Sequence, residues 1–147
     1  MKNFIINVLK WLKALLGDRE LPPPNPEDKT FVVNLSSAIN FFRVNNYLMP
    51  FEYVHAIELL AKDHADTMYA QNKLIDTIPS IKAQYFLRKK NIDTRSMSIS
   101  VVKADNFQDV FNKIRADETY RGMILDGFNT MLGIGKCGEF IAIIFLA

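Results

Sequence analysis

The sequence predicts an α+β domain: an α-β-α sandwich around a small three-stranded antiparallel sheet, preceded by an amphipathic N-terminal helix and a Pro-rich linker. Three observations lead to this fold class. Apolar residues recur at helical spacing between residues 53 and 68. Short β-branched or apolar runs at 98–102, 130–136 and 139–146 are typical of strands. The last run is apolar on both faces, so we expect helices to cover both sides of the sheet.

The first 17 residues carry three lysines and no acidic residue. On a helix, two of these lysines and two asparagines form a narrow polar stripe, and apolar side chains cover the rest of the surface. Such a helix needs a surface to lie on. We favour a groove on a partner protein, with packing on its own domain and a membrane interface as alternatives. The residues predicted to bind the partner are Phe4, Ile5, Val8, Leu9, Trp11, Leu12, Leu15 and Leu16.

The same segment does not have the pattern of a cleaved signal peptide or of a membrane span. Asn7, Lys10 and Lys13 interrupt its apolar run, and no stretch of about 20 apolar residues exists in the chain. Because the chain begins with Met1, we expect a protein that was not exported by signal cleavage. A virion or the cytoplasm is the favoured location, and association with the cell envelope is the alternative.

A Pro-rich segment separates this helix from the rest of the chain. Four of the five residues 22–26 are proline, which favours a stiff extended spacer. The chain is therefore expected to divide into a docking helix (1–20), a linker (21–29) and a folded domain (30–147).

Helices are expected through the first half of the domain. Asn34 is the predicted N-cap of a helix whose apolar face includes Leu35 and Ile39. Pro50 fits the first turn of a second, long helix, and a short third helix spans 80–90. The apolar stripe of the long helix consists of Tyr53, Ile57, Leu60, Ala61, His64, Ala65 and Met68.

Strands and helices alternate in the second half. The strand at 98–102 precedes a helix that Asp105 and Gln108 are expected to open as a capping box. A shorter helix is expected at 118–125. The last two strands form a hairpin, and Gly138 in its turn is free to take a positive φ.

Composition excludes several classes of site. The single cysteine, Cys137, cannot form an intramolecular disulfide, and two histidines are too few for a Cys/His zinc site. A net charge of +2 gives no pull towards nucleic acid, so we expect no nucleic-acid partner. Gly133 and Gly135 lack the third glycine and the following helix of a nucleotide loop, and they are interpreted as points of close backbone approach in a strand.

Four segments occur in an order that resembles a known family. Residues 61–68 (AKDHADTM) resemble an "AxxHAxxM" helix, and residues 35–50 resemble an opening helix that ends in a "Leu-Pro" turn. Residues 119–125 (TYRGMIL) resemble "GHRxNIL", and residues 127–135 (GFNTMLGIG) resemble "xFxxvGvG". These are the motifs of bacterial CAP domains, of the cysteine-rich secretory, antigen-five and pathogenesis-related superfamily. The resemblance covers about 34–147 and implies the α-β-α scaffold of that family.

The resemblance also implies that the metal site of the family is lost. Family members with a metal ion present two His and two Glu in a central cavity. Asp76 stands where the first His is expected, Ile99 replaces a Glu, and Tyr120 replaces the second His. A zinc ion needs three or four ligands around one point, so we expect neither a metal nor a cofactor. The degenerate cavity is assigned to His64, Asp76, Ile99 and Tyr120.

The polar members of this cavity have two interpretations. His64 lies on the apolar stripe of the long helix and is interpreted as a core histidine bonded to the backbone, with a cavity ligand or base as the alternative. Asp76 and Tyr120 are interpreted as making structural hydrogen bonds, with a catalytic pair as the alternative.

The function predicted from these observations is non-catalytic. We expect a structural or adaptor subunit of a larger protein assembly, such as a phage virion component, docked to its protein partner through residues 1–20. The alternative is an envelope-associated CAP-like protein that binds a lipid or peptide, with its helix at the membrane interface. A hydrolase that uses Asp76, Tyr120 or His64 is a third hypothesis.

Overall fold

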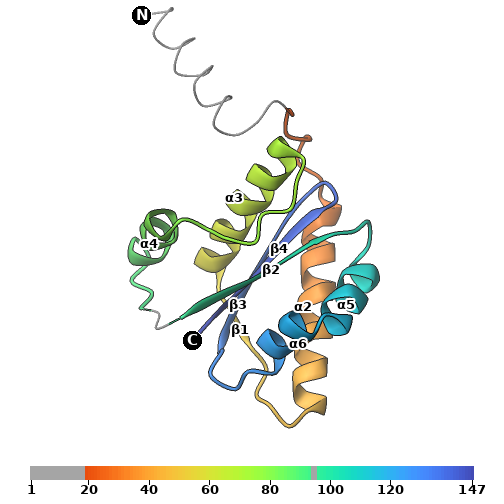
Figure 1. Ribbon diagram of the computed structural model, residues 1–147, viewed down its shortest axis with the longest axis vertical. Helices are drawn as coiled ribbons and strands as arrows, with labels where there is room; N and C mark the ends of the chain where they lie inside the picture. The colour runs from red at the N-terminus through yellow and green to blue at the C-terminus, as the bar shows by residue number, and fades with distance from the viewer. Residues whose placement is uncertain (1–18, 94–95) are drawn as a thin grey trace, which may run out of the picture.

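The structure is a computed structural model that describes residues 19–93 and 96–147 (Figure 1). The predicted partner-binding residues, between 4 and 16, lie outside the described residues. Within the described part, no helix combines the length and the apolar character that a membrane crossing requires.

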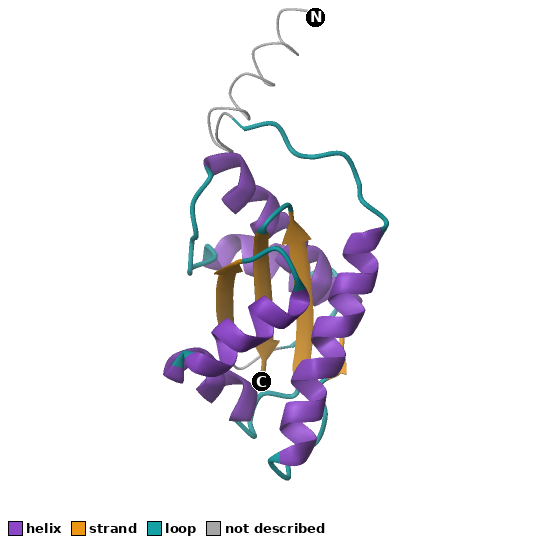
Figure 2. Ribbon diagram, turned by 90° about the vertical axis from the view of Figure 1, so that its right-hand side faces the viewer, coloured by secondary structure: helices purple, strands orange, loops and turns teal. Residues whose placement is uncertain are grey.

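The described residues form five helices and four strands. The helices are α2 (Glu27–Asn45), α3 (His55–Gln71), α4 (Ser80–Arg88), α5 (Phe107–Ala116) and α6 (Glu118–Leu125). The strands are β1 (Glu52–Tyr53), β2 (Met97–Lys103), β3 (Met131–Cys137) and β4 (Phe140–Leu146). The strands form one sheet in the order β1-β3-β4-β2. Helices lie on both sides of this sheet, α3 and α4 on one face and α2, α5 and α6 on the other (Figure 2).

Strand β4 is the centre of the core, and every one of its residues is buried. Successive side chains of a strand point to opposite faces, and β4 supplies both apolar clusters in this way. Ala142 and Ile144 pack with α3 and α4, whereas Ile141 and Ile143 pack with α2, α5 and α6. The prediction that helices cover both faces of the last strand is confirmed.

The sheet has one strand more than predicted and is mixed. β1 pairs with β3 in parallel, with Glu52 opposite Met131 and Tyr53 opposite Leu132. The other strand pairs are antiparallel, as expected. A two-residue strand has no alternation of apolar and polar residues, so its sequence carries no strand signal.

The first helix begins earlier than predicted. α2 starts at Glu27, after Pro26, so the last three residues of the expected linker are helical and Asn34 lies inside the helix. The Asn25 side chain accepts a hydrogen bond from the Glu27 N–H (3.0 Å). Acidic Glu27 and Asp28 occupy the first turn, where they stabilise the positive end of the helix dipole.

The long helix begins later than predicted. α3 starts at His55, and Pro50 precedes β1 rather than the first turn of a helix. Tyr53, predicted on the apolar stripe, belongs to β1 instead. The rest of the stripe is confirmed, because the remaining predicted positions are buried: Ile57, Leu60, Ala61, His64, Ala65 and Met68.

Smaller corrections apply to the second half. The N-cap of α5 is Asn106, whose side chain accepts from the Asp109 N–H (2.8 Å), and not Asp105. Cys137 pairs with Phe140, so the hairpin turn is one residue later than expected. Gly138 in this turn has a φ of +58°, which confirms the predicted positive φ.

Candidate functional site

His64 is a buried residue bonded to the backbone. Its Nε2 lies 2.6 Å from the carbonyl oxygen of Ile75, in the loop that follows α3. Burial lowers the pKa of this imidazole, and the Ile75 carbonyl opposes this effect without cancelling it. These contacts agree with the interpretation of His64 as a core histidine.

The other residues of the degenerate cavity do not all lie on the same face of the sheet as His64. Ile99 belongs to the apolar cluster under α3 and α4, and Tyr120 packs against the cluster on the opposite face of the sheet. Asp76 is exposed, and it makes no hydrogen bond or ion pair with Tyr120. Among residues 19–93 and 96–147, no group of three or more His, Cys, Asp or Glu side chains is arranged to hold a metal ion.

A buried arginine at the end of α2 ties two loops together. The Arg43 guanidinium donates hydrogen bonds to the carbonyl oxygens of Met49 (2.7 Å), Ile124 (2.7 Å), Asp126 (3.0 Å) and Asn129 (3.1 Å). Its side chain is only 2 % exposed and stacks on the ring of Phe51. Removing a charge from water is costly unless the charged group is paired or hydrogen-bonded. The hydrogen bonds to these four carbonyls offset the cost of burying the Arg43 guanidinium.

The two loops held by Arg43 carry an exposed apolar surface, which we call the apolar tip. Tyr47 is 98 % exposed and Phe128 is 83 % exposed. The tip lies at the end of the domain opposite the start of the described chain (Figure 1). Its members on the last turns of α2 and on these loops are Phe41, Val44, Tyr47, Met49 and Phe128.

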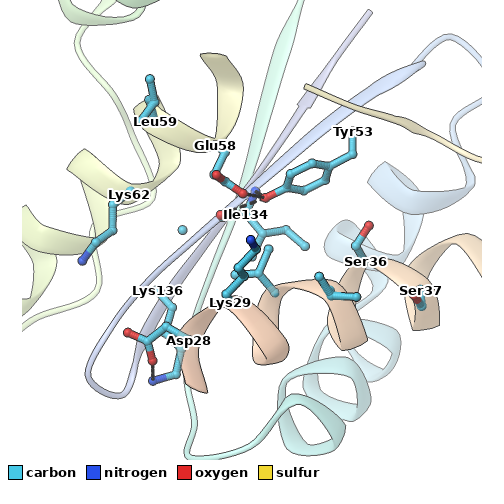
Figure 3. Close-up of a pocket in the computed structure, with 13 residues that line it drawn as sticks. Asp28, Lys29, Ser36, Ser37, Tyr53, Glu58, Leu59, Lys62, Ile134 and Lys136 are labelled. Atoms are coloured by element: carbon cyan, nitrogen blue, oxygen red, sulfur yellow. Dashed lines mark hydrogen bonds and ion pairs between the residues drawn. The ribbon is translucent and has the colours of Figure 1, made fainter. Parts of the chain in front are cut away.

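A groove of about 700 Å³ opens between α2 and α3, beside β3 (Figure 3). One wall is the exposed side of α2, with Val32, Val33 and Ser36, and the other is the first turns of α3, with Leu59. None of the four residues predicted for the degenerate cavity lines this groove. The groove is therefore a site separate from the family's cavity as the motifs place it.

The floor of the groove is the edge of β3 that β1 does not reach. The N–H groups of Glu52 and Val54 donate to the carbonyls of Thr130 and Leu132 (2.9 Å each), and this pairing ends there. Alternate residues of a strand direct their backbone groups to the same edge. The next two on this edge are Ile134 and Lys136.

Tyr53 closes one end of the groove. Its hydroxyl donates to the Glu58 carboxylate and accepts the N–H of Ile134 (3.4 Å) (Figure 3). Burial raises the pKa of this phenol, and the neighbouring Glu58 carboxylate raises it further. The carboxylate also accepts a hydrogen bond from, or pairs with, His55 Nδ1 (3.1 Å).

Most charges at the groove are paired within the protein. Lys136 Nζ donates to Asp28 (3.1 Å) and to the Gly138 carbonyl (2.7 Å), and Lys62 pairs with Asp66 (2.6 Å). Lys29 makes no hydrogen bond or ion pair with the residues that the structure describes. The groove thus combines apolar walls, an unpaired strand edge and one available cation.

The sequence analysis missed this groove because it depends on where β1 ends. Tyr53 was placed on a helix, and nothing in a single chain segment shows that β3 lacks a partner beyond Leu132. One signal was visible: the two glycines of β3 were interpreted as points of close approach. A Cβ on Gly133 or Gly135 would overlap the backbone of α3, so this interpretation is confirmed.

The fold, but not the sequence, is similar to known proteins. No protein-family model and no curated protein sequence matches this chain. An extracellular protein containing an SCP domain from Bacillus anthracis str. Ames superposes with a TM-score of 0.73 at 15% identity, over 85% of this chain and 44% of that chain. A cysteine-rich secretory protein from Staphylococcus aureus superposes with a TM-score of 0.69 at 14% identity, over 84% of this chain and 40% of that chain.

An outer surface protein from Borrelia burgdorferi has a similar size as well as fold. Its TM-score is 0.69 at 14% identity, over 84% of this chain and 95% of that chain. This chain spans less than half of the Bacillus and Staphylococcus chains. The bacterial CAP-like fold that the motifs predicted is confirmed, and at these identities the likeness concerns the fold alone.

Proposed function

We propose that this chain is a non-catalytic structural or adaptor subunit of a larger protein assembly, such as a phage virion, attached through residues 1–20. The observation that carries the proposal is the apolar tip. An adaptor needs two contact surfaces, and the tip is a candidate for the second, at the end of the domain opposite the start of the described chain (Figure 1).

The composition of the tip supports a protein contact. Tyr47 and Phe128 are exposed aromatic residues on two loops that Arg43 joins, and exposed aromatic residues are common at sites that bind another protein. Arg43 holds both loops by their carbonyls, so Tyr47 and Phe128 stand on a fixed framework. A fixed surface loses less conformational entropy on binding, which favours association.

The point where the N-terminal segment joins the domain is also held. The Arg19 N–H donates to the Ala70 carbonyl (3.2 Å), and its guanidinium donates to Asn72 (3.0 Å) and Glu139 (3.2 Å). The guanidinium also lies 3.8 Å from the centre of the Tyr69 ring. Arg19, the first described residue, is therefore held at the end of α3.

Crosslinking of the intact chain in its native source tests the adaptor role. Lys2, Lys10 and Lys13 are suited to amine-reactive crosslinkers, and mass spectrometry then identifies what they contact. We expect crosslinks to one partner at a constant molar ratio, and we expect the double variant Leu9→Glu/Leu12→Glu to lose them. The control Asn7→Gln changes the polar stripe and should retain them.

The opposite result would contradict the adaptor role. A chain that stays monomeric in its source, or a double variant that keeps the same partner at the same ratio, would show that the N-terminal segment does not dock the protein. Substitution of Tyr47 and Phe128 by Ser tests the second surface in the same experiment, and it should remove any crosslinks made from the tip.

An envelope-associated protein is the second candidate, in which the N-terminal segment lies at a membrane interface. One observation favours it: the Borrelia protein of similar fold and size is an outer surface protein. Flotation of the full chain with vesicles of phosphatidylcholine and phosphatidylglycerol tests this role. Strong flotation that Leu9→Glu/Leu12→Glu abolishes would support it, and absence of flotation would exclude it.

A further inference from the structure

We propose that the groove between α2 and α3 binds an extended peptide of a partner protein as an added strand on β3, with an acidic side chain of the peptide paired to Lys29. The groove and the apolar tip are separate surfaces. Peptide binding in the groove is therefore testable whether or not the chain is an adaptor.

The unpaired edge of β3 selects an extended backbone. Ile134 and Lys136 direct their backbone groups to this edge, beyond the last bond that β1 makes at Leu132. A second strand supplies alternating N–H and C=O groups at the spacing these residues require. An exposed strand edge that remains unpaired is also a surface that other chains tend to join.

Tyr53 satisfies only part of this edge. A phenol has one proton, and here it goes to the Glu58 carboxylate. The hydroxyl accepts the Ile134 N–H and also lies 3.3 Å from the Ile134 carbonyl oxygen, so both backbone groups of Ile134 face Tyr53. An incoming strand would therefore bond to Lys136 freely and would compete with Tyr53 at Ile134.

The walls of the groove select apolar side chains. The side chains of an added strand alternate between the two helix-lined walls. Val33 is 56 % exposed and Leu59 is 39 % exposed, and both line the groove. Burial of such side chains against an apolar residue of the peptide would stabilise the complex.

The charge of the groove selects a partner from outside this chain. Asp28 and Asp66 already neutralise Lys136 and Lys62, and the Glu58 carboxylate is bonded to Tyr53 and His55 at one end of the groove. Lys29 is left to pair with a carboxylate of the ligand. The first 17 residues of this chain contain three lysines and no acidic residue. The N-terminal segment therefore lacks the complementary charge, and a separate protein with an acidic extended segment fits better.

Titration of the full chain with two blocked peptides tests the proposal. The probes are Ac-DVTVT-amide and Ac-TVTVD-amide. They place the acidic residue at opposite ends, because a strand parallel to β3 and one antiparallel to it present opposite ends to Lys29. We expect one of them to bind saturably and to shift the backbone amide signals of Ile134 and Lys136. N-methylation of its central threonine removes a backbone donor and should weaken binding about fivefold or more.

Three variants of the full chain localise the binding. Lys29→Glu should weaken binding severalfold, whereas the control Lys73→Glu, an exposed lysine outside the groove, should not change it. Tyr53→Phe removes the hydroxyl that competes for Ile134 and should tighten binding. Circular dichroism confirms that each variant is folded.

Four results would overturn the proposal. The first is that neither probe binds saturably, and the second is that N-methylation does not weaken binding. The third is that Lys29→Glu and Lys73→Glu have equal effects. The fourth is that the backbone amide signals of Ile134 and Lys136 shift in the absence of any probe. In the last case, a dependence on protein concentration would assign the groove to a second copy. A change caused by Leu9→Glu would assign it to the chain's own N-terminal segment.

Discussion

Gly135 of β3 lies directly against the backbone of Ala61 in α3. A Cβ built on Gly135 would overlap the Ala61 carbonyl group and the Lys62 amide nitrogen. Gly133 meets Ile57 and Glu58 in the same way. The two glycines therefore set the distance between α3 and the sheet, and with it one wall of the groove.

Gly135→Ala should destabilise the protein. The obstacle is helix backbone, which cannot rotate away as a side chain can, so α3 must shift from the sheet. We expect a loss of about 3 kcal/mol in the free energy of unfolding, measured with urea. The control is Gly122→Ala in α6, where a Cβ would meet nothing within 4 Å.

The control should move in the opposite direction. Alanine is a better helix former than glycine, so Gly122→Ala should stabilise the protein by about 0.5–1 kcal/mol. If Gly135→Ala were as stable as the original chain, α3 would have to be free to move, and the close packing would not be a determinant of the fold.

Arg43→Met should cost about 3 kcal/mol or more. The substitution keeps much of the apolar volume but leaves carbonyl groups of two loops without a donor, and each such loss costs about 1–3 kcal/mol. Urea unfolding measures the loss. Arg88→Met, at an exposed position on α4, should change stability by less than about 0.5 kcal/mol. Equal effects of the two substitutions would show that Arg43 is not the tie between the loops.

Stability should fall as the pH decreases below about 6.5, partly because of His64. Burial lowers the pKa of His64 in the folded protein, so the unfolded chain binds a proton at a higher pH than the folded chain does. The stability that this histidine contributes is therefore complete above its unfolded pKa and is lost as the pH falls towards its folded pKa.

His64→Gln tests this origin. Glutamine retains an N–H donor for the Ile75 carbonyl and cannot be protonated in this range. The slope of unfolding free energy against pH, between about pH 7 and 5.5, should be smaller in the variant. An unchanged slope would assign the pH dependence to other groups.

Cys137 should be unreactive in the folded protein. Burial raises the pKa of its thiol to about 12, and the reactive form of cysteine is the thiolate. At about pH 8, we expect a disulfide reagent to modify the folded chain at least 100-fold more slowly than the urea-unfolded chain. Similar rates in both states would show that the β3–β4 hairpin opens readily.

Local patterns predicted most of the elements. The stripe from Ile57 to Met68 is a helix because its apolar side chains recur on one face, and the runs before and after Gly138 are strands because their apolar residues are continuous. The motifs resembling CAP domains led to the correct fold. Helix starts were less predictable, since Pro26 and Asn34 both fit a helix N-terminus and only one is used.

The candidate site depended on contacts between distant segments. Tyr53, Glu58 and Ile134 meet because a two-residue parallel strand places Tyr53 beside β3. Tyr53 and Ile134 are 81 residues apart in the sequence. Arg43 reaches carbonyls as far as Asn129, and those bonds create the framework of the apolar tip. No residue pattern within one segment reports such pairings.

By itself, the sequence determined most of the helices and strands, and that the last strand is covered on both sides. These properties follow from side-chain type and spacing, which act over a few residues. Only the tertiary structure decided that Tyr120 packs on the face of the sheet opposite Ile99 and α3, and that β3 has an open edge between α2 and α3. Those outcomes depend on which segments pair and how closely their backbones approach, and the balance of burial and hydrogen bonding that decides this is summed over the whole fold.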